Sequence, residues 1–282
     1  MAPLTDKKIL ELKKMANDIR QSIIEMLVEA KSGHTAGPLG MADIFTLFYF
    51  HILKHNPKDP FWEERDRLIL SNGHICPVLY STMAHSGYFP PEELKTLRKL
   101  GSRLQGHPHR EYLKFVENSS GPLGEGLSQA VGMALADRMD QKVGHRYIYC
   151  FMSDGEHDEG NTWEAIMLAG KNKLNNLIAV VDRNNIQIDG NTEKVMPLEP
   201  LQDKWRAYNW EVIETGGHDF QDLNEAVEKA QKVVDKPIVI IAHTVPGKGV
   251  SFMEYDYKWH GMPPNKEQGE KALKELKDRR PI

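Results

Sequence analysis

Two polar turns, about thirty residues apart, carry residue types that hold a divalent cation and a diphosphate group. Asp154 and Gly155 follow an apolar run at residues 147–152, and Asn184 follows a second such run at residues 177–181. Ligands of parallel sheets lie beyond the carboxyl ends of the strands, so Asp154 and Asn184 are expected to face one crevice. A hard cation such as Mg²⁺ binds carboxylate and amide oxygens and completes its octahedron with phosphate oxygens and water. The alternative is an ordinary turn role, which Asp-Gly and Asn-Asn pairs usually have.

Three histidines follow glycines directly, in turns of the kind that approach a ligand closely. They are His34, His74 and His107, and His74 comes after an apolar run at residues 67–70. Histidine suits proton transfer, because its unperturbed pKa of about 6.5 lies close to neutral pH. A histidine in a loop is more often only a polar loop residue. His107 and His109 are spaced for a transition metal, but no third ligand stands at a diagnostic spacing, so zinc is disfavoured.

A glycine-rich loop at residues 121–126 precedes a helix of small residues at 130–136. Glycine lets the backbone approach a ligand, and the unpaired amides at the start of a helix attract anions. Tight helix packing is the competing explanation for these glycines. The segment at residues 246–250 lacks the spacing of a nucleotide-binding loop and its following Ser or Thr, so an ATP site is not expected.

The spacing of apolar residues predicts the elements that position these groups. The runs at 147–152 and 177–181 have the length of buried strands, and residues 161–173 between them have helical spacing. A strand, a helix and a strand in this order predict a crossover between parallel strands. An opening helix is expected to end near residue 31, and a glycine-rich turn to lead into a helix at 42–50.

The composition is that of an ordinary soluble enzyme. Of the 282 residues 40% are hydrophobic and 27% charged, and the net charge of -4 gives no indication of nucleic-acid binding. No apolar run reaches the roughly 18 to 20 residues of a membrane helix, and no signal peptide is recognised, so a cytoplasmic location is expected. Two cysteines cannot build a disulfide framework. We expect one domain, residues 1–282, with a charged helical tail from about residue 265.

These motifs resemble those of transketolases, and in particular the separately encoded amino-terminal subunit of that enzyme. Ser-Gly-His, Ser-Asn-Gly-His, Gly-His-Pro, Gly-x-Leu-Gly-x-Gly and Trp-His-Gly occur in the family in this order, and they stand here at His34, His74, His107, residues 121–126 and His260. The diphosphate motif matches at residues 154–165 and 181–190. The resemblance covers nearly the whole chain. It implies an α/β fold, with a doubly wound, mostly parallel sheet and helices on both faces, that binds thiamine diphosphate.

The resemblance also implies roles for the matching residues. The metal ligands would be Asp154, Asn184 and the carbonyl of Ile186, for Mg²⁺ or else Ca²⁺ or Mn²⁺. The other cofactor-binding residues would be His74, Gly121, Leu123, Gly155, Glu156 and His260. The catalytic residues would be His34, His74, His107, His260 and Glu159. Glu159 and Glu164 resemble carboxylates of a network that links paired active sites.

The activity implied is transfer of a two-carbon ketol unit from a ketose phosphate, such as xylulose 5-phosphate, to an aldose phosphate, such as ribose 5-phosphate, in the pentose phosphate pathway. The family's pyrimidine-binding domain has no counterpart up to Ile282, so we expect activity only with a separate carboxy-terminal subunit, in an α2β2 assembly. Three alternatives remain: another thiamine diphosphate enzyme such as a deoxyxylulose-phosphate synthase, a transketolase for an unusual sugar phosphate, or a noncatalytic binding subunit.

Three of the motifs depart from the family pattern, at four positions. Ser153 replaces the first glycine of Gly-Asp-Gly, which is acceptable only if this position does not need a positive φ. Thr35 and Ala36 follow His34 where Pro-Gly is common, and Pro246 stands where many members have a lysine. These two changes bear on substrate preference and cofactor affinity.

Overall fold

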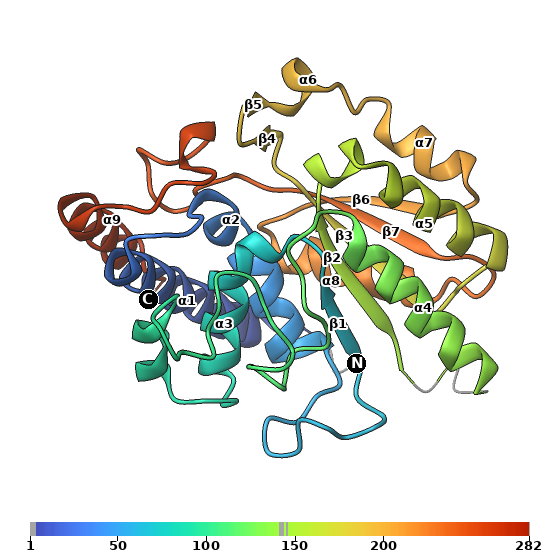
Figure 1. Ribbon diagram of the computed structural model, residues 1–282, viewed down its shortest axis with the longest axis horizontal. Helices are drawn as coiled ribbons and strands as arrows, with labels where there is room; N and C mark the ends of the chain where they lie inside the picture. The colour runs from blue at the N-terminus through green and yellow to red at the C-terminus, as the bar shows by residue number, and fades with distance from the viewer. Residues whose placement is uncertain (1–3, 141–143, 145, 282) are drawn as a thin grey trace.

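A five-stranded sheet forms the centre of the molecule (Figure 1). The structure is a computed structural model that describes residues 4–140, 144 and 146–281. The strand order is β1-β2-β3-β7-β6, and every neighbouring pair is parallel. The strands are β1 (Arg67–Leu70), β2 (Ile148–Ser153), β3 (Leu177–Arg183), β6 (Glu211–Gly216) and β7 (Ile238–His243). The predicted fold class is confirmed.

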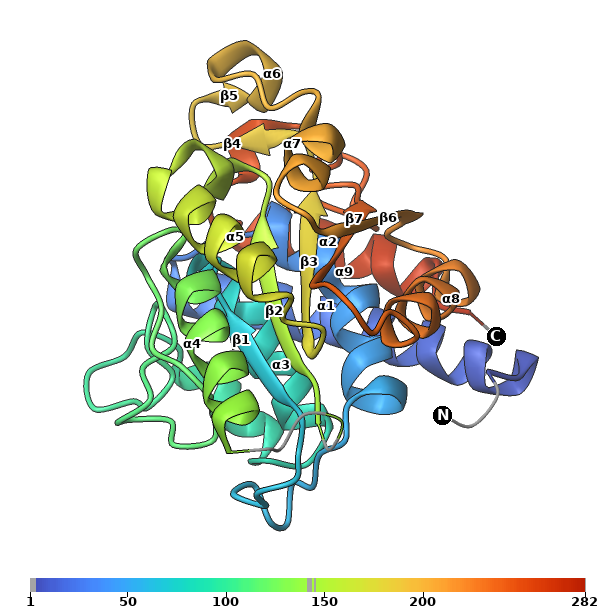
Figure 2. The same cartoon turned by 90° about the vertical axis from the view of Figure 1, so that its right-hand side faces the viewer.

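Helices cover both faces of this sheet (Figures 1 and 2). One layer contains α1 (Asp6–Ala30), α2 (Ala36–Leu47), α3 (Cys76–His85) and α8 (Phe220–Gln231), and the other contains α4 (Glu125–Met139), α5 (Gly160–Asn172) and α7 (Leu201–Ala207). Successive residues of a strand point to opposite faces, so Phe151 packs in the first layer while Cys150 and Met152 pack in the second. Burial on both faces explains why the central strands are apolar throughout.

The predicted crossover is confirmed. The chain passes from β2 through α5 to β3, and the two strands pair in register from Ile148 with Leu177 to Ser153 with Asp182. The strand before the histidine turn at His74, β1, has the predicted bounds. Asp154 and Asn184 therefore both lie just beyond the same edge of the sheet.

The helix expected at 42–50 begins earlier, at Ala36, so the prediction of its start was wrong. The glycines here serve close helix packing instead of a turn. A Cβ on Gly37 would lie 2.9 Å from the Ile75 side chain, and one on Gly40 would lie 3.0 Å from the Val245 carbonyl oxygen. The helix ends at Leu47 and is followed by a π-helical turn at Phe48–Ile52.

The charged segment after residue 265 forms α9 (Lys266–Asp278), which packs against α1. Asn265 caps it: its side chain accepts a hydrogen bond from the Gln268 N–H, and the Gln268 side chain accepts one from the Asn265 N–H. Ala272 and Leu276 are buried on the side of α9 that faces the core. No helix in the described ranges is long and apolar enough to span a membrane.

The loops beyond the carboxyl ends of the strands contain the short elements. Turns of 3-10 helix follow β1 at Gly73–Ile75 and β2 at Gly155–Asp158. After β3 comes a segment at residues 184–200, which we call the 184–200 segment. It holds β4 (Ile186–Gln187), β5 (Gly190–Asn191) and α6 (Thr192–Val195), and it stands above the sheet edge in Figures 1 and 2. Two more 3-10 turns lie at Pro91–Thr96 and Tyr257–Trp259.

The packing of α4 on the end of β1 gives a test of this arrangement. A Cβ on Gly126 would lie 2.4 Å from the Ser71 Cα, whereas one on Gly132 in the same helix would meet nothing within 4 Å. We expect Gly126→Ala to lower the free energy of unfolding by about 1–3 kcal/mol, because backbone cannot yield to the new methyl group. The matched control Gly132→Ala should raise it by about 0.5–1 kcal/mol through helix propensity. Urea unfolding measures both, and equal stability of the two variants would contradict the packing.

Candidate functional site

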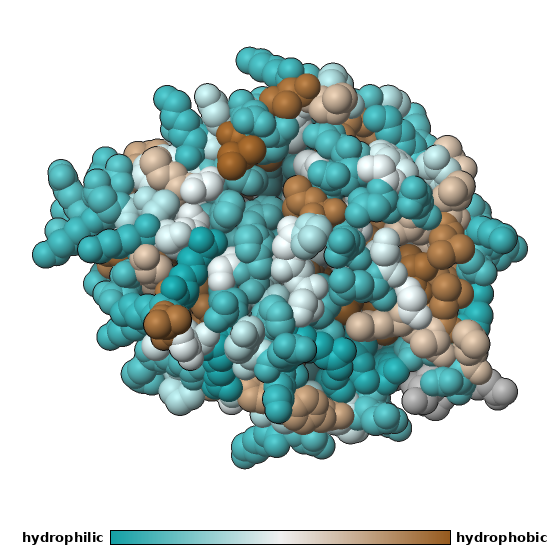
Figure 3. All heavy atoms as spheres, in the orientation of Figure 1, coloured by the Kyte–Doolittle hydropathy of each residue, from teal (hydrophilic) through white to brown (hydrophobic). Residues whose placement is uncertain are grey.

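A pocket of about 440 Å³ lies at the carboxyl edge of the sheet, and loops from all parts of the chain line it. In Figure 3 this face is hollowed below the brown side chains over β4 and α6. The residues that line the pocket are His34, His74, His107, Gly121, Leu123, Ser153, Gly155, Asp158, Glu159, Ile186, Gln187, Ile188 and His260. The four histidines singled out from the sequence thus meet in one cavity.

Three of the histidines form a compact cluster. Ring centroids are 4.9 Å apart for His34 and His74, 5.1 Å for His74 and His260, and 5.6 Å for His34 and His260. His34 precedes α2, His74 lies in the turn after β1, and His260 follows the turn at Tyr257–Trp259. His107 lies on the wall beside the glycine loop, where a Cβ on Gly121 would come within 4.0 Å of its ring.

The environment of the cluster keeps these rings neutral at pH 7. Burial lowers the pKa of His34 to about 4, and the nearby His260, Arg98 and His107 act in the same direction. Burial also lowers the pKa of His74 well below its usual range, and it lowers the pKa of His107 and of His260. A neutral imidazole has one nitrogen free to accept a proton. The buried Nδ1 of His34 has no hydrogen-bond partner in the described part of the protein, which fits a polar ligand at this point.

Asp154 lies fully buried under the pocket floor. Its Oδ1 accepts a hydrogen bond from the Gly155 N–H at 2.8 Å, and its Oδ2 accepts one from the Asn185 N–H at 2.7 Å and one from Arg183 Nη1 at 3.1 Å. Burial raises the pKa of Asp154 to about 6, while the charge of Arg183 and these hydrogen bonds oppose the shift. One lone pair on Oδ1 therefore remains for a further partner.

A second buried carboxylate orients Asn184. Asp182 Oδ2 accepts a hydrogen bond from Asn184 Nδ2 at 2.8 Å, and its Oδ1 accepts one from the Thr244 hydroxyl. Burial raises the pKa of Asp182 to about 7, and the charge of Asp154 acts in the same direction. Because the amide nitrogen is held by Asp182, the amide oxygen of Asn184 points the other way and accepts the Ile186 N–H, at 3.0 Å. It too has a lone pair to offer.

This donor set fits a hard divalent cation that also binds a diphosphate. One carboxylate oxygen and one amide oxygen, together with the Ile186 carbonyl that the family resemblance implies as a ligand, leave part of an octahedron to phosphate oxygens and water. Among the described residues, no three His, Cys, Asp or Glu side chains gather as a metal cluster. Ser153 is not among the residues with positive φ, so its side chain is compatible with this turn.

The glutamates of the diphosphate motif have different surroundings. Glu156 does not line the pocket: it is fully buried and accepts hydrogen bonds from the Ser71 hydroxyl, from the Gly124 N–H at 2.8 Å and from the Ser153 N–H at 2.7 Å. It thereby ties together the loops after β1 and β2 and the start of α4. Glu159 is exposed on the pocket rim, and Glu164 is exposed on α5.

The sequence reasoning missed several residues that the fold brings to the pocket. Asp158, Gln187 and Ile188 line it, although only the matched motifs around them pointed to these segments. The contacts of Arg183 were missed as well, because residue types in a strand do not say which loop returns to meet them. Pro246 does not line the pocket, but the following Gly247 N–H donates to the Ala36 carbonyl at 2.9 Å and so holds this loop against α2.

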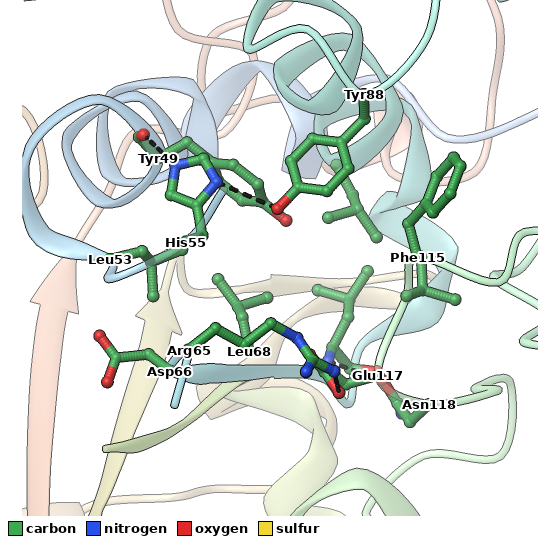
Figure 4. Close-up of a pocket in the computed structure, with 13 residues that line it drawn as sticks. Tyr49, Leu53, His55, Arg65, Asp66, Leu68, Tyr88, Phe115, Glu117 and Asn118 are labelled. Carbon is green, nitrogen blue, oxygen red and sulfur yellow. Dashed lines mark hydrogen bonds and ion pairs between the residues drawn. The ribbon is translucent and has the colours of Figure 1, made fainter. Parts of the chain in front are cut away.

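A second, much smaller cavity lies beside β1, and polar side chains that line it are paired with one another or with backbone groups (Figure 4). His55 bridges the Tyr49 carbonyl at 2.7 Å and the Tyr88 hydroxyl at 3.0 Å, so both of its ring nitrogens are used. Arg65 forms a two-pronged ion pair with Glu117. A cavity of about 30 Å³ holds about one water molecule. This cavity therefore has no room for a substrate.

Comparisons with known proteins agree with this geometry. The family model "Transketolase, thiamine diphosphate binding domain" matches residues 11–279. The chain is 42% identical to a 6-deoxy-6-sulfo-D-fructose transketolase subunit of Clostridium sp. (strain MSTE9), over 95% of this chain and 96% of that one. It is 40% identical to an apulose-4-phosphate transketolase subunit of Phocaeicola vulgatus, over 96% of this chain and 94% of that one.

The solved structure of Campylobacter jejuni transketolase superposes with a TM-score of 0.88 at 40% identity. The match covers 94% of this chain but only 42% of the C. jejuni chain, so this chain corresponds to about two fifths of that enzyme. A family model over nearly the whole length and relatives of similar length lead to one conclusion. The chain belongs to the transketolase family and has that family's thiamine diphosphate binding domain.

Proposed function

We propose that this chain is the diphosphate-binding subunit of a two-subunit transketolase, with residues 1–282 acting as one domain. The observation that carries the proposal is the single pocket in which a histidine cluster adjoins the oxygen donors at the ends of β2 and β3. Such a reaction needs two things from this half of an active site: ligand oxygens that keep a lone pair for a cation, and neutral groups that accept protons.

In this proposal Asp154, Asn184 and the Ile186 carbonyl hold the divalent cation, with Mg²⁺ as the first candidate. Gly155, Gly121 and Leu123 lie along the pocket wall, where backbone can contact the diphosphate and the ring next to it. His74 and His260 are the further cofactor contacts. Thiamine diphosphate, when bound, supplies the carbanion and the electron sink for breaking the bond between C2 and C3 of the ketose.

The histidines are proposed to move protons. His34, His107 and His260 line the cavity, and their lowered pKa values leave them able to accept a proton from a substrate hydroxyl at neutral pH. Glu159 on the rim is proposed as a carboxylate of the link between paired sites. Glu156 acts from below, by holding the loops that form the diphosphate wall.

The partner is proposed to be a separate subunit with the pyrimidine-binding domain, in an α2β2 assembly. Two relatives that match this chain over nearly their whole length are named as transketolase subunits, which supports a divided protein. A cytoplasmic location is part of the proposal, and the free cysteines Cys76 and Cys150 are compatible with it.

Two substrate classes are candidates. The first donor and acceptor pair is xylulose 5-phosphate and ribose 5-phosphate, as for transketolases in general. The second is a less common sugar, because the relatives with matching length are named for 6-deoxy-6-sulfo-D-fructose and for apulose 4-phosphate. Both classes use the same ketol transfer, so the pocket chemistry is unchanged between them.

Reconstitution tests the proposal. Ketol transfer from xylulose 5-phosphate to ribose 5-phosphate is measured with Mg²⁺ and thiamine diphosphate, for this chain alone and with a candidate pyrimidine-binding subunit. We expect turnover only in the mixture, since half a site binds the cofactor without completing it. If the mixture assembles and binds the cofactor but shows no turnover, apulose 4-phosphate and 6-deoxy-6-sulfo-D-fructose are assayed next. Turnover by this chain alone would contradict the divided enzyme.

The proposed cation ligand can be tested by binding. Asp154→Asn keeps the shape of the side chain but removes the charge, and we expect it to weaken thiamine diphosphate binding in the presence of Mg²⁺ on the order of 100-fold. Asp158→Asn is the matched control, because Asp158 lines the same pocket but is exposed; its effect should stay within about threefold. Calorimetry measures both, and wild-type affinity in Asp154→Asn would remove Asp154 from the site.

The neutral state of His34 predicts a pH effect on stability. Its pKa in the folded chain, about 4, lies below the unfolded value of about 6.5. The stability it contributes is therefore complete above pH 6.5 and is lost as the pH falls toward 4. We expect His34→Gln to reduce the pH slope of the unfolding free energy between pH 6 and pH 5 by about 1.4 kcal/mol per pH unit. Urea unfolding at several pH values gives the slope, and equal slopes would mean that His34 is charged in the folded chain.

A further inference from the structure

Arg183 is the last residue of β3 and is only 3% exposed. We propose that Arg183 is a positioning residue of the cation site: it restricts Asp154 to one metal-binding oxygen and holds the 184–200 segment closed over that site. This inference rests on the cation site proposed above. In this inference, Arg183 makes the cation site prefer small octahedral cations over larger ones.

The restriction follows from the lone pairs of Asp154. A carboxylate oxygen has two in-plane positions for hydrogen bonds or metal contacts. On Oδ2 one is taken by Arg183 Nη1 at 3.1 Å and the other by the Asn185 N–H at 2.7 Å. Oδ1 accepts the Gly155 N–H and keeps its second position open. A cation therefore meets Asp154 through Oδ1 alone.

The same guanidinium binds the far end of the 184–200 segment. Nη1 also donates to the Thr192 hydroxyl at 3.0 Å, and Nη2 donates to Glu193 Oε1 at 2.7 Å and to Glu199 Oε1 at 2.8 Å. Glu193 in turn accepts the Leu198 N–H at 3.2 Å. The segment thus leaves β3 at Asn184, makes its turn and is fastened again to the residue from which it started. We call the contacts of Arg183 with Glu193 and Glu199 the latch.

The latch matters because the 184–200 segment contains part of the pocket. The proposed ligand Ile186 and the wall residues Gln187 and Ile188 all belong to it. Arg183 is buried at one side of the latch, whereas the Glu193 and Glu199 side chains are 33% and 55% exposed. A planar fork can meet several carboxylates at once, which a lysine ammonium does less well.

Cations differ in the coordination geometry and the number of ligands that they accept. Mg²⁺ requires near-ideal octahedral geometry and single carboxylate oxygens, while Ca²⁺ takes six to eight ligands and often both oxygens of a carboxylate. With Oδ2 blocked, Asp154 suits Mg²⁺. Release of Oδ2 would let Asp154 bind with both oxygens, which helps Ca²⁺ more than Mg²⁺. A change in this preference is a signature that general loss of structure does not produce.

The experiment compares cation affinities in the full chain. Mg²⁺ and Ca²⁺ are titrated separately with thiamine diphosphate present at a fixed concentration, and the ratio of the Ca²⁺ Kd to the Mg²⁺ Kd is the readout. We expect Arg183→Gln to lower this ratio about tenfold, the effect of one charge-assisted hydrogen bond on one ligand oxygen. Circular dichroism checks folding. If Arg183→Gln does not fold, Arg183→Lys decides, with an expected decrease of about threefold.

Two further variants separate the effect of the latch from the effect of Arg183 on the metal-binding oxygens of Asp154. Removing Glu193 and Glu199 together by Ala substitution leaves Arg183 on Asp154, so hydrogen exchange in the 184–200 segment of the metal-free chain should rise about tenfold while the cation ratio stays within about twofold. Arg206→Gln removes an equal charge from an exposed site on α7, where Arg206 contacts Asp203 and Gln202. It should change neither readout.

The outcomes are distinct. A lowered cation ratio in the Arg183 variant, with an unchanged ratio in the double Ala variant, supports the assignment. An Arg183 variant that binds both cations with the wild-type ratio overturns it and leaves the proposed cation site intact. A wild-type chain that binds neither cation overturns the cation site, and this inference with it. Unchanged exchange in the double Ala variant overturns the latch.

Discussion

The parallel, in-register pairing of β2 with β3 is the constraint on which the rest of the structure depends. It sets Ser153 beside Asp182, so that both strands end at one level and their next residues share the space beyond the edge. Parallel strands require crossovers, and the crossovers fill both faces of the sheet with helices. The loops at the carboxyl ends of the strands line the pocket. The pocket and its oxygen donors are a consequence of that geometry.

Burying carboxylates at this edge of the sheet costs free energy unless hydrogen-bond donors surround them. Asp154, Asp182 and Glu156 are all buried, and each is surrounded by N–H and O–H donors in place of water. Burial nevertheless raises the pKa of all three carboxyl groups. A purely structural role would be served as well by apolar side chains. Retaining two acids around Asn184 is therefore consistent with a site that gains a cation when the cofactor binds.

The second feature of this pocket is the histidine cluster, whose rings are neutral at pH 7. Burial disfavours the charged form of these imidazoles, and around His34 and His74 the neighbouring histidines act in the same direction, so the rings remain neutral over the pH range in which they are proposed to accept protons. The proposed cation ligands lie at the floor, beyond the ends of β2 and β3. The proposed division is therefore between an oxygen-rich floor that fixes the cofactor and a nitrogen-rich wall that moves protons. Arg183 fastens the 184–200 segment, which contributes to the floor and to the wall.

The sequence alone determined the chemistry-bearing residues and the strands that end at them. Apolar runs of strand length stopping at Asp154 and Asn184 are a local pattern, and their outcome follows from parallel pairing. Only the tertiary structure decided which polar groups contact one another and which are exposed. Glu156 has the same residue type as Glu159, yet one is buried among three loops and the other lies on the rim. The contact between Arg183 and Glu199 and the early start of α2 depend on residues that are not neighbours in the sequence. The spacing of apolar residues within one element cannot predict such contacts.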